Sequence, residues 1–442
     1  MTGNIGVARG TALCVGAVLG PGVLVLPALA VRAAGPASLL AWAALMAVSV
    51  LIAASFASLG ARYPDGGGVA AFTRRAFGAP AAAIVGSWLY TAVPVGVVAG
   101  VIAGARYTAA ALDASPTTVA GICAVLLAAV YGANLVGLHL SGRLHLALTA
   151  ALVALLVAVI AVAGPRVDAE RLTPFAPHGV AGVGSAAAVL FASICGWEAT
   201  ANLSAEFTHP RQVRRAAVAS MSVIIVLYTG LAICTVGVLG DTAGDTPVPL
   251  IHLLGATGRP WATATIAVLA VLLTFGASFT FVAAGARAGV SLARNHVLPA
   301  RVAVTRQGVP RRSVAVQAAA GAVVAVIAAA APGIVTVDLL VRVFAALLAC
   351  VTVVGLAAAV RLLPVARSRA GAAVAALAVT VIAALRGPSL LAPAAVAAIV
   401  LARLDRASSP AAAMRAAATG TDRHASLGDV RARGTAAKAG IR

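Results

Sequence analysis

The chain has 442 residues, of which 62% are hydrophobic and 10% are charged. A soluble domain carries about 25% charged and 45–50% apolar residues, so an ordinary soluble protein is excluded. Apolar stretches able to cross roughly 30 Å of hydrocarbon recur along most of the length, without the two-residue alternation of membrane β-strands. We therefore predict an all-α protein that crosses a membrane about twelve times.

The net charge of +20 raises the question of a nucleic-acid partner. Most of the Lys and Arg residues lie, however, in alternate loops and in the C-terminal stretch, whereas the other loops carry acids such as Asp168 and Asp241. This distribution follows the positive-inside rule, which places the basic loops and both termini in the cytoplasm. We therefore expect a multi-pass protein of the cell membrane and no nucleic-acid partner.

The first predicted span, residues 11–32, is interrupted at its centre by Gly20-Pro21-Gly22. A proline inside a helix removes one backbone hydrogen bond and costs roughly 3 kcal/mol. In hydrocarbon the freed backbone groups find no water, so irregular backbone is tolerated only where it lines a cavity or is buried in protein. The interruption therefore indicates a place where a solute binds.

The sixth predicted span carries a second interruption, at residues 193–198. Two interrupted spans at corresponding places in two halves of a chain are the best sequence indication of a binding site at the membrane midplane. The spans after the first are predicted at 38–60, 81–105, 117–138, 144–164, 180–203, 216–240, 260–285, 313–331, 334–360, 370–386 and 388–402.

One transmembrane domain over residues 1–402 accounts for these spans. We expect a first repeat over about 11–164, a second over about 180–360, and two additional helices over 370–402. Residues 403–442 are rich in Ala, Arg and Gly without hydrophobic periodicity. They predict a disordered basic cytoplasmic tail.

The sequence shows no sign of a cofactor or of catalytic chemistry. All five cysteines fall in predicted spans without CxxC spacing, and no His, Cys and Asp residues have the spacing of metal ligands. A membrane-embedded enzyme would need a polar catalytic cluster at the membrane edge, and none is recognisable. We therefore expect no metal, no cofactor and no enzymatic activity.

Several motifs occur in the order found in one known family. They are Leu19-Gly20-Pro21-Gly22-Val23, the loop Arg62-Tyr63-Pro64 with Gly66-Gly67-Gly68, Val93-Pro94-Val95-Gly96, Gly196-Trp197-Glu198 with His209-Pro210-Arg211, and Ala293-Arg294-Asn295. Over residues 10 to about 365 the chain resembles the amino acid–polyamine–organocation superfamily of permeases. Within it, the resemblance is to the bacterial branch that exports methionine and branched-chain amino acids.

The resemblance implies a LeuT-like core of five plus five inverted helices, with two more appended and the substrate held by the unwound parts of spans one and six. Proline at position 21 departs from the small residue that many members carry there. The substrate-binding candidates are Leu19, Gly20, Pro21, Gly22, Val23, Phe191, Ser193, Cys195 and Gly196.

An amino acid is a zwitterion, and both of its charges need partners inside the membrane. The half-helix that begins near Gly22 offers N–H groups to a carboxylate. Unwound carbonyls around residues 191–195 would accept hydrogen bonds from the ammonium, with Ser193 adding a hydroxyl. The alternative is that Gly20 and Gly22 only let two helices pack closely.

Four further residues are candidates for coupling or gating. Glu198 is the only Glu in a predicted span, and an acid at the bilayer centre costs about 2.5–3.5 kcal/mol. Because burial favours its neutral form, it is a candidate proton carrier; the alternative is a structural anchor for the unwound segment. Tyr90 is a candidate for lining the pathway. Asp338 and Arg342, four residues apart on one helix, either pair with each other or form an extracellular gate.

These observations predict a secondary amino-acid transporter that works by alternating access. We expect it to export small neutral apolar amino acids such as Met, Leu, Ile and Val. Protons are the candidate coupling ion. An uptake permease and a transporter of another solute remain alternatives. A polyamine carrier would need several pathway carboxylates, and only Glu198 is available. The oligomeric state stays open.

Overall fold

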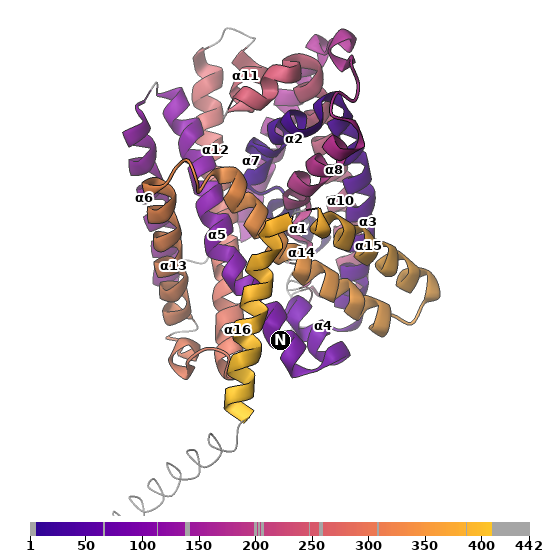
Figure 1. Cartoon of the computed structure of the whole chain (residues 1–442), viewed down its shortest axis with the longest axis vertical. Helices are drawn as coiled ribbons and strands as arrows, with labels where there is room; N and C mark the ends of the chain where they lie inside the picture. The colour runs from indigo at the N-terminus through magenta and orange to yellow at the C-terminus, as the bar shows by residue number, and fades with distance from the viewer. Residues whose placement is uncertain are drawn as a thin grey trace, which may run out of the picture.

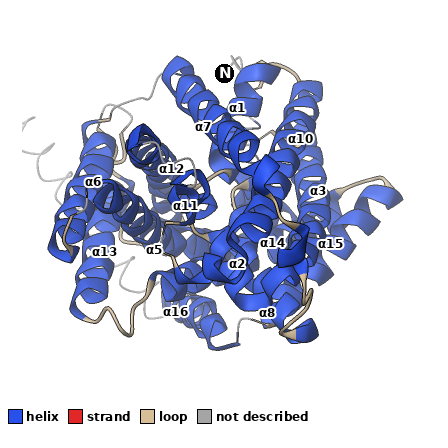
Figure 2. Ribbon diagram, turned by 90° about the horizontal axis from the view of Figure 1, so that it is seen from above, coloured by secondary structure: helices blue, strands red, loops and turns tan. Residues whose placement is uncertain are grey.

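The computed structural model describes residues 6–408 apart from 65–66, 113, 138–141, 199–200, 202–203, 205–206, 247, 256–259, 307–308 and 386. In this part of the chain the regular elements are helices, and none is a β-strand (Figures 1 and 2). The predicted all-α fold is therefore confirmed.

Ten helices in the described part of the chain are long and apolar enough to cross a membrane. The first of these candidate spans runs from Leu26 to Arg62 and so includes α2 (Leu26–Ala34) as well as α3. The helices are α3 (Ser38–Arg62), α5 (Ala79–Ala111), α6 (Pro116–Val136), α7 (Gly142–Ala163), α10 (Pro210–Cys234), α12 (Pro260–Arg294), α13 (Arg311–Ala330), α14 (Val337–Leu362), α15 (Ala366–Ala384) and α16 (Leu391–Ser408).

The remaining two predicted spans, the first and the sixth, consist of shorter pieces, so the count of twelve stays a prediction. Several helices extend beyond the predicted ends, as α12 does by running on to Arg294. Hydropathy marks only the apolar part of a helix, whereas its backbone ladder continues into the polar surroundings.

The first span breaks where the sequence predicted. It consists of α1 (Val7–Val18), the 3₁₀ turn η1 (Pro21–Leu24) and α2 (Leu26–Ala34). Gly20 is extended, with φ −79° and ψ −177°. Pro21 occupies the first position of η1, where a missing N–H costs no helical hydrogen bond. Proline therefore starts the second part of the span.

The sixth span is broken at the predicted place as well. It runs through α8 (Gly179–Leu190) and the 3₁₀ turn η5 (Phe191–Ile194) to an extended Cys195. Gly196 has φ +139°, a conformation that residues with a side chain rarely adopt. A Cβ on Gly196 would lie 2.5 Å from the Ala17 carbonyl oxygen of α1. Glycine here therefore permits the backbones of the two broken spans to touch.

The intact helices surround these two spans. The helix α5 packs along α12 and α14, and α3 packs along α10, while α1 contacts α10 and α2 contacts α8. Figure 1 shows the N-terminus and the short α4 (Gly68–Phe77) at one end of the bundle and α2 with α11 (Pro249–Gly255) at the other. The breaks therefore lie in the interior of the helical bundle.

Candidate functional site

A central cavity of about 70 Å³ lies where the two breaks meet α5, α12 and α14. A single water needs at least about 10–15 Å³, so this space holds several waters or a small ligand. The broken spans contribute Ala17, Val18, Gly20, Gly22, Val25, Leu26, Ala192, Ser193 and Cys195. The intact helices contribute Gly96, Val97, Ala99, Gly100, Ala103, Tyr228, Ala277, Ser278, Phe281, Val337, Val341 and Phe344.

The lining of the central cavity is small, apolar and uncharged. Its α5 residues are Gly, Ala and Val, and α12 and α14 contribute Phe281 and Phe344, whose ring centroids lie 6.0 Å apart. Hydroxyl groups enter the lining only through Ser193, Ser278 and Tyr228. Polar recognition in this cavity therefore depends on these hydroxyls and on the exposed backbone of the two breaks.

Tyr228 of α10 connects the two broken spans. Its hydroxyl lies 3.2 Å from the Val18 carbonyl oxygen at the end of α1 and 3.0 Å from the Ser193 carbonyl oxygen in η5. Its ring packs on Trp42 of α3 at 4.9 Å between centroids. Broken helices leave carbonyl groups without intrahelical partners, and Tyr228 supplies a shared donor for one such group in each span.

Tyr107 of α5 also forms hydrogen bonds to backbone groups, at a position farther along the first span. Its buried hydroxyl donates to the Leu24 carbonyl oxygen of η1 at 2.6 Å and accepts from the Leu250 N–H of α11 at 3.3 Å. The sequence interpretation missed Tyr107 and Tyr228. A signal was present for Tyr228, which falls in the predicted span 216–240, because a tyrosine within an apolar span needs a hydrogen-bond partner for its hydroxyl.

Glu198 is buried directly after the sixth-span break and is not among the residues that line the central cavity. One carboxylate oxygen accepts from the Gly196 N–H at 2.8 Å, and the other is hydrogen-bonded to the Thr352 hydroxyl of α14 at 2.5 Å. The carboxyl group therefore connects the turn at Gly196 to a neighbouring intact helix.

The remaining predicted substrate residues divide into two groups. Gly20, Gly22, Ser193 and Cys195 line the central cavity. The second group, which consists of Leu19, Val23, Phe191 and Gly196, is absent from the lining, and the three apolar side chains are 0–1% exposed within the core. The Ser193 hydroxyl donates to the Leu190 carbonyl at 2.6 Å, so its hydrogen is already engaged. The side chain of Pro21 lies outside the described part of the structure.

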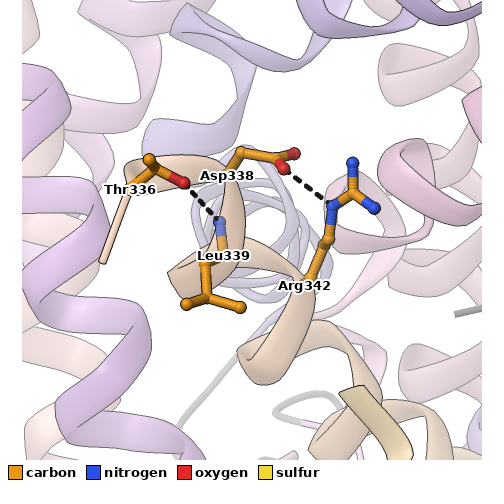
Figure 3. Close-up of polar contacts among 4 residues, drawn as sticks. All are labelled: Thr336, Asp338, Leu339 and Arg342. Carbon is orange, nitrogen blue, oxygen red and sulfur yellow. Dashed lines mark hydrogen bonds and ion pairs between the residues drawn. The ribbon is translucent and has the colours of Figure 1, made fainter. Parts of the chain in front are cut away.

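The gating candidates lie apart from the cavity lining. Tyr90 of α5 donates to the Ser313 carbonyl of α13 at 3.2 Å. Asp338 and Arg342 form an ion pair of 2.8 Å on the first turns of α14 (Figure 3). The Thr336 hydroxyl caps the same helix by accepting a hydrogen bond from the Leu339 N–H. The pair is adjacent along α14 to Val337 and Val341, which do line the cavity.

The likeness in fold to solved structures is extensive. A manganese transporter from Eremococcus coleocola superposes with a TM-score of 0.60 over 90% of this chain and 92% of its own, at 14% identity. Such solved neighbours have the LeuT fold. At this identity the likeness concerns the fold alone. The architecture therefore defines the class of fold: a multi-helix membrane protein of the LeuT fold.

The family follows from sequence comparison. A family model described as "Amino acid permease" matches residues 5–401, and the chain belongs to this family. The chain is 32% identical over 294 residues to the uncharacterized amino acid permease YecA of Bacillus subtilis, covering 66% of this chain and 69% of that protein. It is 34% identical over 280 residues to the L-methionine/branched-chain amino acid exporter YjeH of Escherichia coli, covering 60% and 65%.

Proposed function

We propose that this amino acid permease carries small neutral apolar amino acids, and that it exports them by alternating access. The uncharged, apolar lining of the central cavity is the observation that carries this proposal. A basic or acidic substrate side chain would be buried there without a charged partner, which is costly. The relative YjeH, an exporter of L-methionine and branched-chain amino acids, supports both the substrate class and the direction.

Backbone groups of the two breaks would bind the charged ends of the substrate. Val23 N–H already donates to the Gly20 carbonyl at 3.1 Å, and Pro21 has no N–H. Gly22 N–H is therefore the donor that we assign to the carboxylate. The Val18 carbonyl already accepts from the Gly20 N–H at 2.8 Å and also faces the Tyr228 hydroxyl, so the Ser193 carbonyl is the acceptor that we assign to the ammonium.

The test is a substrate panel in proteoliposomes that contain the purified full chain. We expect internal unlabelled Met or Leu to drive exchange of labelled Leu, whereas internal Arg, Glu or spermidine does not. Exchange with none of the apolar amino acids would contradict the proposed substrate class. Direction is tested in cells preloaded with labelled methionine, where export predicts faster loss with the protein present. Faster uptake without faster loss would favour an uptake permease.

We further propose that Glu198 carries the coupling proton. The Thr352 hydroxyl lies 2.9 Å from the Leu348 carbonyl as well as beside Glu198, and its single hydrogen serves one acceptor fully. When that hydrogen goes to Leu348, a protonated Glu198 can donate to Thr352 in return. The site therefore accommodates both the charged and the neutral carboxyl group.

Glu198→Gln separates coupling from folding. The amide keeps an acceptor for Gly196 N–H and a donor for Thr352, so we expect the variant to fold and to exchange substrate without a gradient. Stimulation of transport by an imposed pH gradient should be lost. The control Glu170→Gln removes an exposed carboxylate in the loop before α8 and should retain the stimulation. Equal stimulation in all three proteins would contradict the role of Glu198.

A further inference from the structure

A second cavity, of about 390 Å³, lies away from the central one and shares no lining residue with it. We call it the basic cavity. Three arginines line it: Arg62 at the end of α3, and Arg211 and Arg214 in the first turns of α10. The connection between α14 and α15 contributes Leu363, Pro364 and Val365, and the first turn of α15 (Ala366–Ala384) contributes Ser368. Its volume is in the range of about 300–1,000 Å³ that is usual for ligand sites.

The positive charge in the basic cavity is unbalanced by the described residues. None of the three arginines forms an ion pair with another of the described residues. Arg62 lies 5.7 Å from the centroid of the Tyr63 ring, and Arg75 of α4 lies 4.9 Å from the same centroid, which adds a further cation beside the cavity. Several like charges at one place favour a bound anion.

The residue types indicate which anion fits. Guanidinium groups bind phosphate oxygens through pairs of parallel hydrogen bonds, and the start of a long helix such as α10 adds favourable N–H dipoles. Ser58 and Ser368 place two hydroxyl groups in the same lining. Leu363 and Val365 add apolar surface, and the Val365 side chain is 57% exposed. A basic pocket between membrane helices with an apolar edge is typical of sites for anionic lipid headgroups.

We propose that the basic cavity binds a phosphate group, supplied by an anionic lipid headgroup or by free phosphate. The bound group would offset part of the positive charge of Arg62, Arg211 and Arg214 and connect the end of α3 with the starts of α10 and α15. This site is independent of the transported substrate, because it lies outside the central cavity. Occupancy is expected to stabilise the helical bundle by mass action.

The test compares the wild-type full chain with the triple variant Arg62→Gln, Arg211→Gln, Arg214→Gln. Thermal unfolding is measured in detergent with added phosphatidylglycerol, phosphatidylcholine or inorganic phosphate. A matched control, Arg287→Gln, Arg301→Gln, Arg306→Gln, removes three exposed arginines that do not line the cavity. We expect an anionic ligand to raise the melting temperature of the wild type and of the control, and to bind the cavity variant about tenfold or more weakly.

The two arms distinguish the sources of phosphate. A shift with phosphatidylglycerol that the cavity variant loses assigns a lipid headgroup, and a shift with inorganic phosphate that it loses assigns the free ion. An equal response of the cavity variant and the control, or no response to either anion in the wild type, overturns the proposal. If the triple variant does not fold, the single variants Arg211→Gln and Arg214→Gln should each lose part of the shift, and an undiminished shift in both also overturns it.

Discussion

Gly20 and Gly22 differ in what surrounds them, although the motif treats them alike. A Cβ on Gly22 would lie 2.8 Å from Cδ1 of Leu26, whereas a Cβ on Gly20 would meet nothing within 4 Å. Gly20 also has an extended backbone that any residue adopts. The space beside Gly20 is the central cavity itself. We therefore expect that folding does not require glycine at position 20. The absence of a side chain there leaves space in the central cavity.

Gly20→Ala should therefore impair substrate binding without harming the fold. The methyl group enters a confined site, and such overpacking typically costs about 1–3 kcal/mol, which corresponds to an apparent affinity for leucine at least about fivefold weaker. The melting temperature should stay the same or rise, because alanine restricts the unfolded chain. Leucine exchange in proteoliposomes and thermal unfolding provide the two readouts.

Gly121→Ala is the matched control. Gly121 lies in α6, a Cβ there also meets nothing within 4 Å, and the residue does not line the central cavity. Leucine exchange should be normal in this variant. If Gly20→Ala exchanged leucine as well as Gly121→Ala does, the substrate would have to bind elsewhere.

At the scale of elements, the two broken spans depend on side chains from intact helices. Tyr228 of α10 contacts carbonyls of both breaks, and Tyr107 of α5 holds η1 to α11. Glu198 and Thr352 hold the second break to α14. Each of these contacts replaces hydrogen bonds that an unbroken helix would make within itself. The substrate site is therefore built jointly by broken and intact elements.

Tyr228→Phe should loosen both breaks together. The ring can still pack on Trp42, so the expected loss is that of the hydroxyl, about 0.5–2 kcal/mol of unfolding free energy. Transport should fall, because the Val18 and Ser193 carbonyls lose the hydroxyl donor that they share. Thermal unfolding and exchange of labelled leucine measure the two effects.

Tyr131→Phe is a control of the same chemistry. The Tyr131 hydroxyl is buried in α6 without a hydrogen-bond partner among the described residues. Its removal should be neutral or stabilising, since an unsatisfied buried polar group is lost. Equal effects of the two substitutions on stability and transport would contradict the bridging role of Tyr228.

The whole molecule has two chemically different ends, and the basic end is proposed to face the cytoplasm. Ser115 precedes α6 and Thr305 precedes α13. Between them the chain passes through α6, α7, the broken sixth span, α10 and α12. An odd number of crossings puts the two residues on opposite sides of the membrane. By the positive-inside rule, the many arginines near Thr305 predict that this side faces the cytoplasm.

Thiol labelling of intact cells tests this orientation. A membrane-impermeant maleimide should label Ser115→Cys directly, and it should label Thr305→Cys only after the membrane is permeabilised. Both side chains are exposed at their positions. The unsubstituted chain serves as the control for its five native cysteines. The reverse pattern would show that the termini lie outside the cell, and the proposed direction of transport would need revision.

The sequence by itself determined the class of fold and the places of the two breaks. Hydrophobicity is a property of each local stretch, and it decides whether a segment can lie in hydrocarbon. Glycine and proline act on their own backbone, so the breaks at Gly20 and near Gly196 were visible without any knowledge of packing. The motifs also led to the correct family, because their order along the chain is a property of sequence.

Only the tertiary structure decided which residues line the central cavity and what holds it open. Leu19 and Val23 belong to the same motif as Gly20, yet their side chains are buried in the core. Whether neighbouring residues face a cavity depends on the rotation of a short irregular segment, which no periodic pattern specifies. Tyr228 and Thr352 form hydrogen bonds to the breaks, and Arg62 and Arg214 line one cavity, although these residues are far apart in sequence. Such meetings follow from helix packing, because side chains remote in sequence become neighbours only when the bundle assembles.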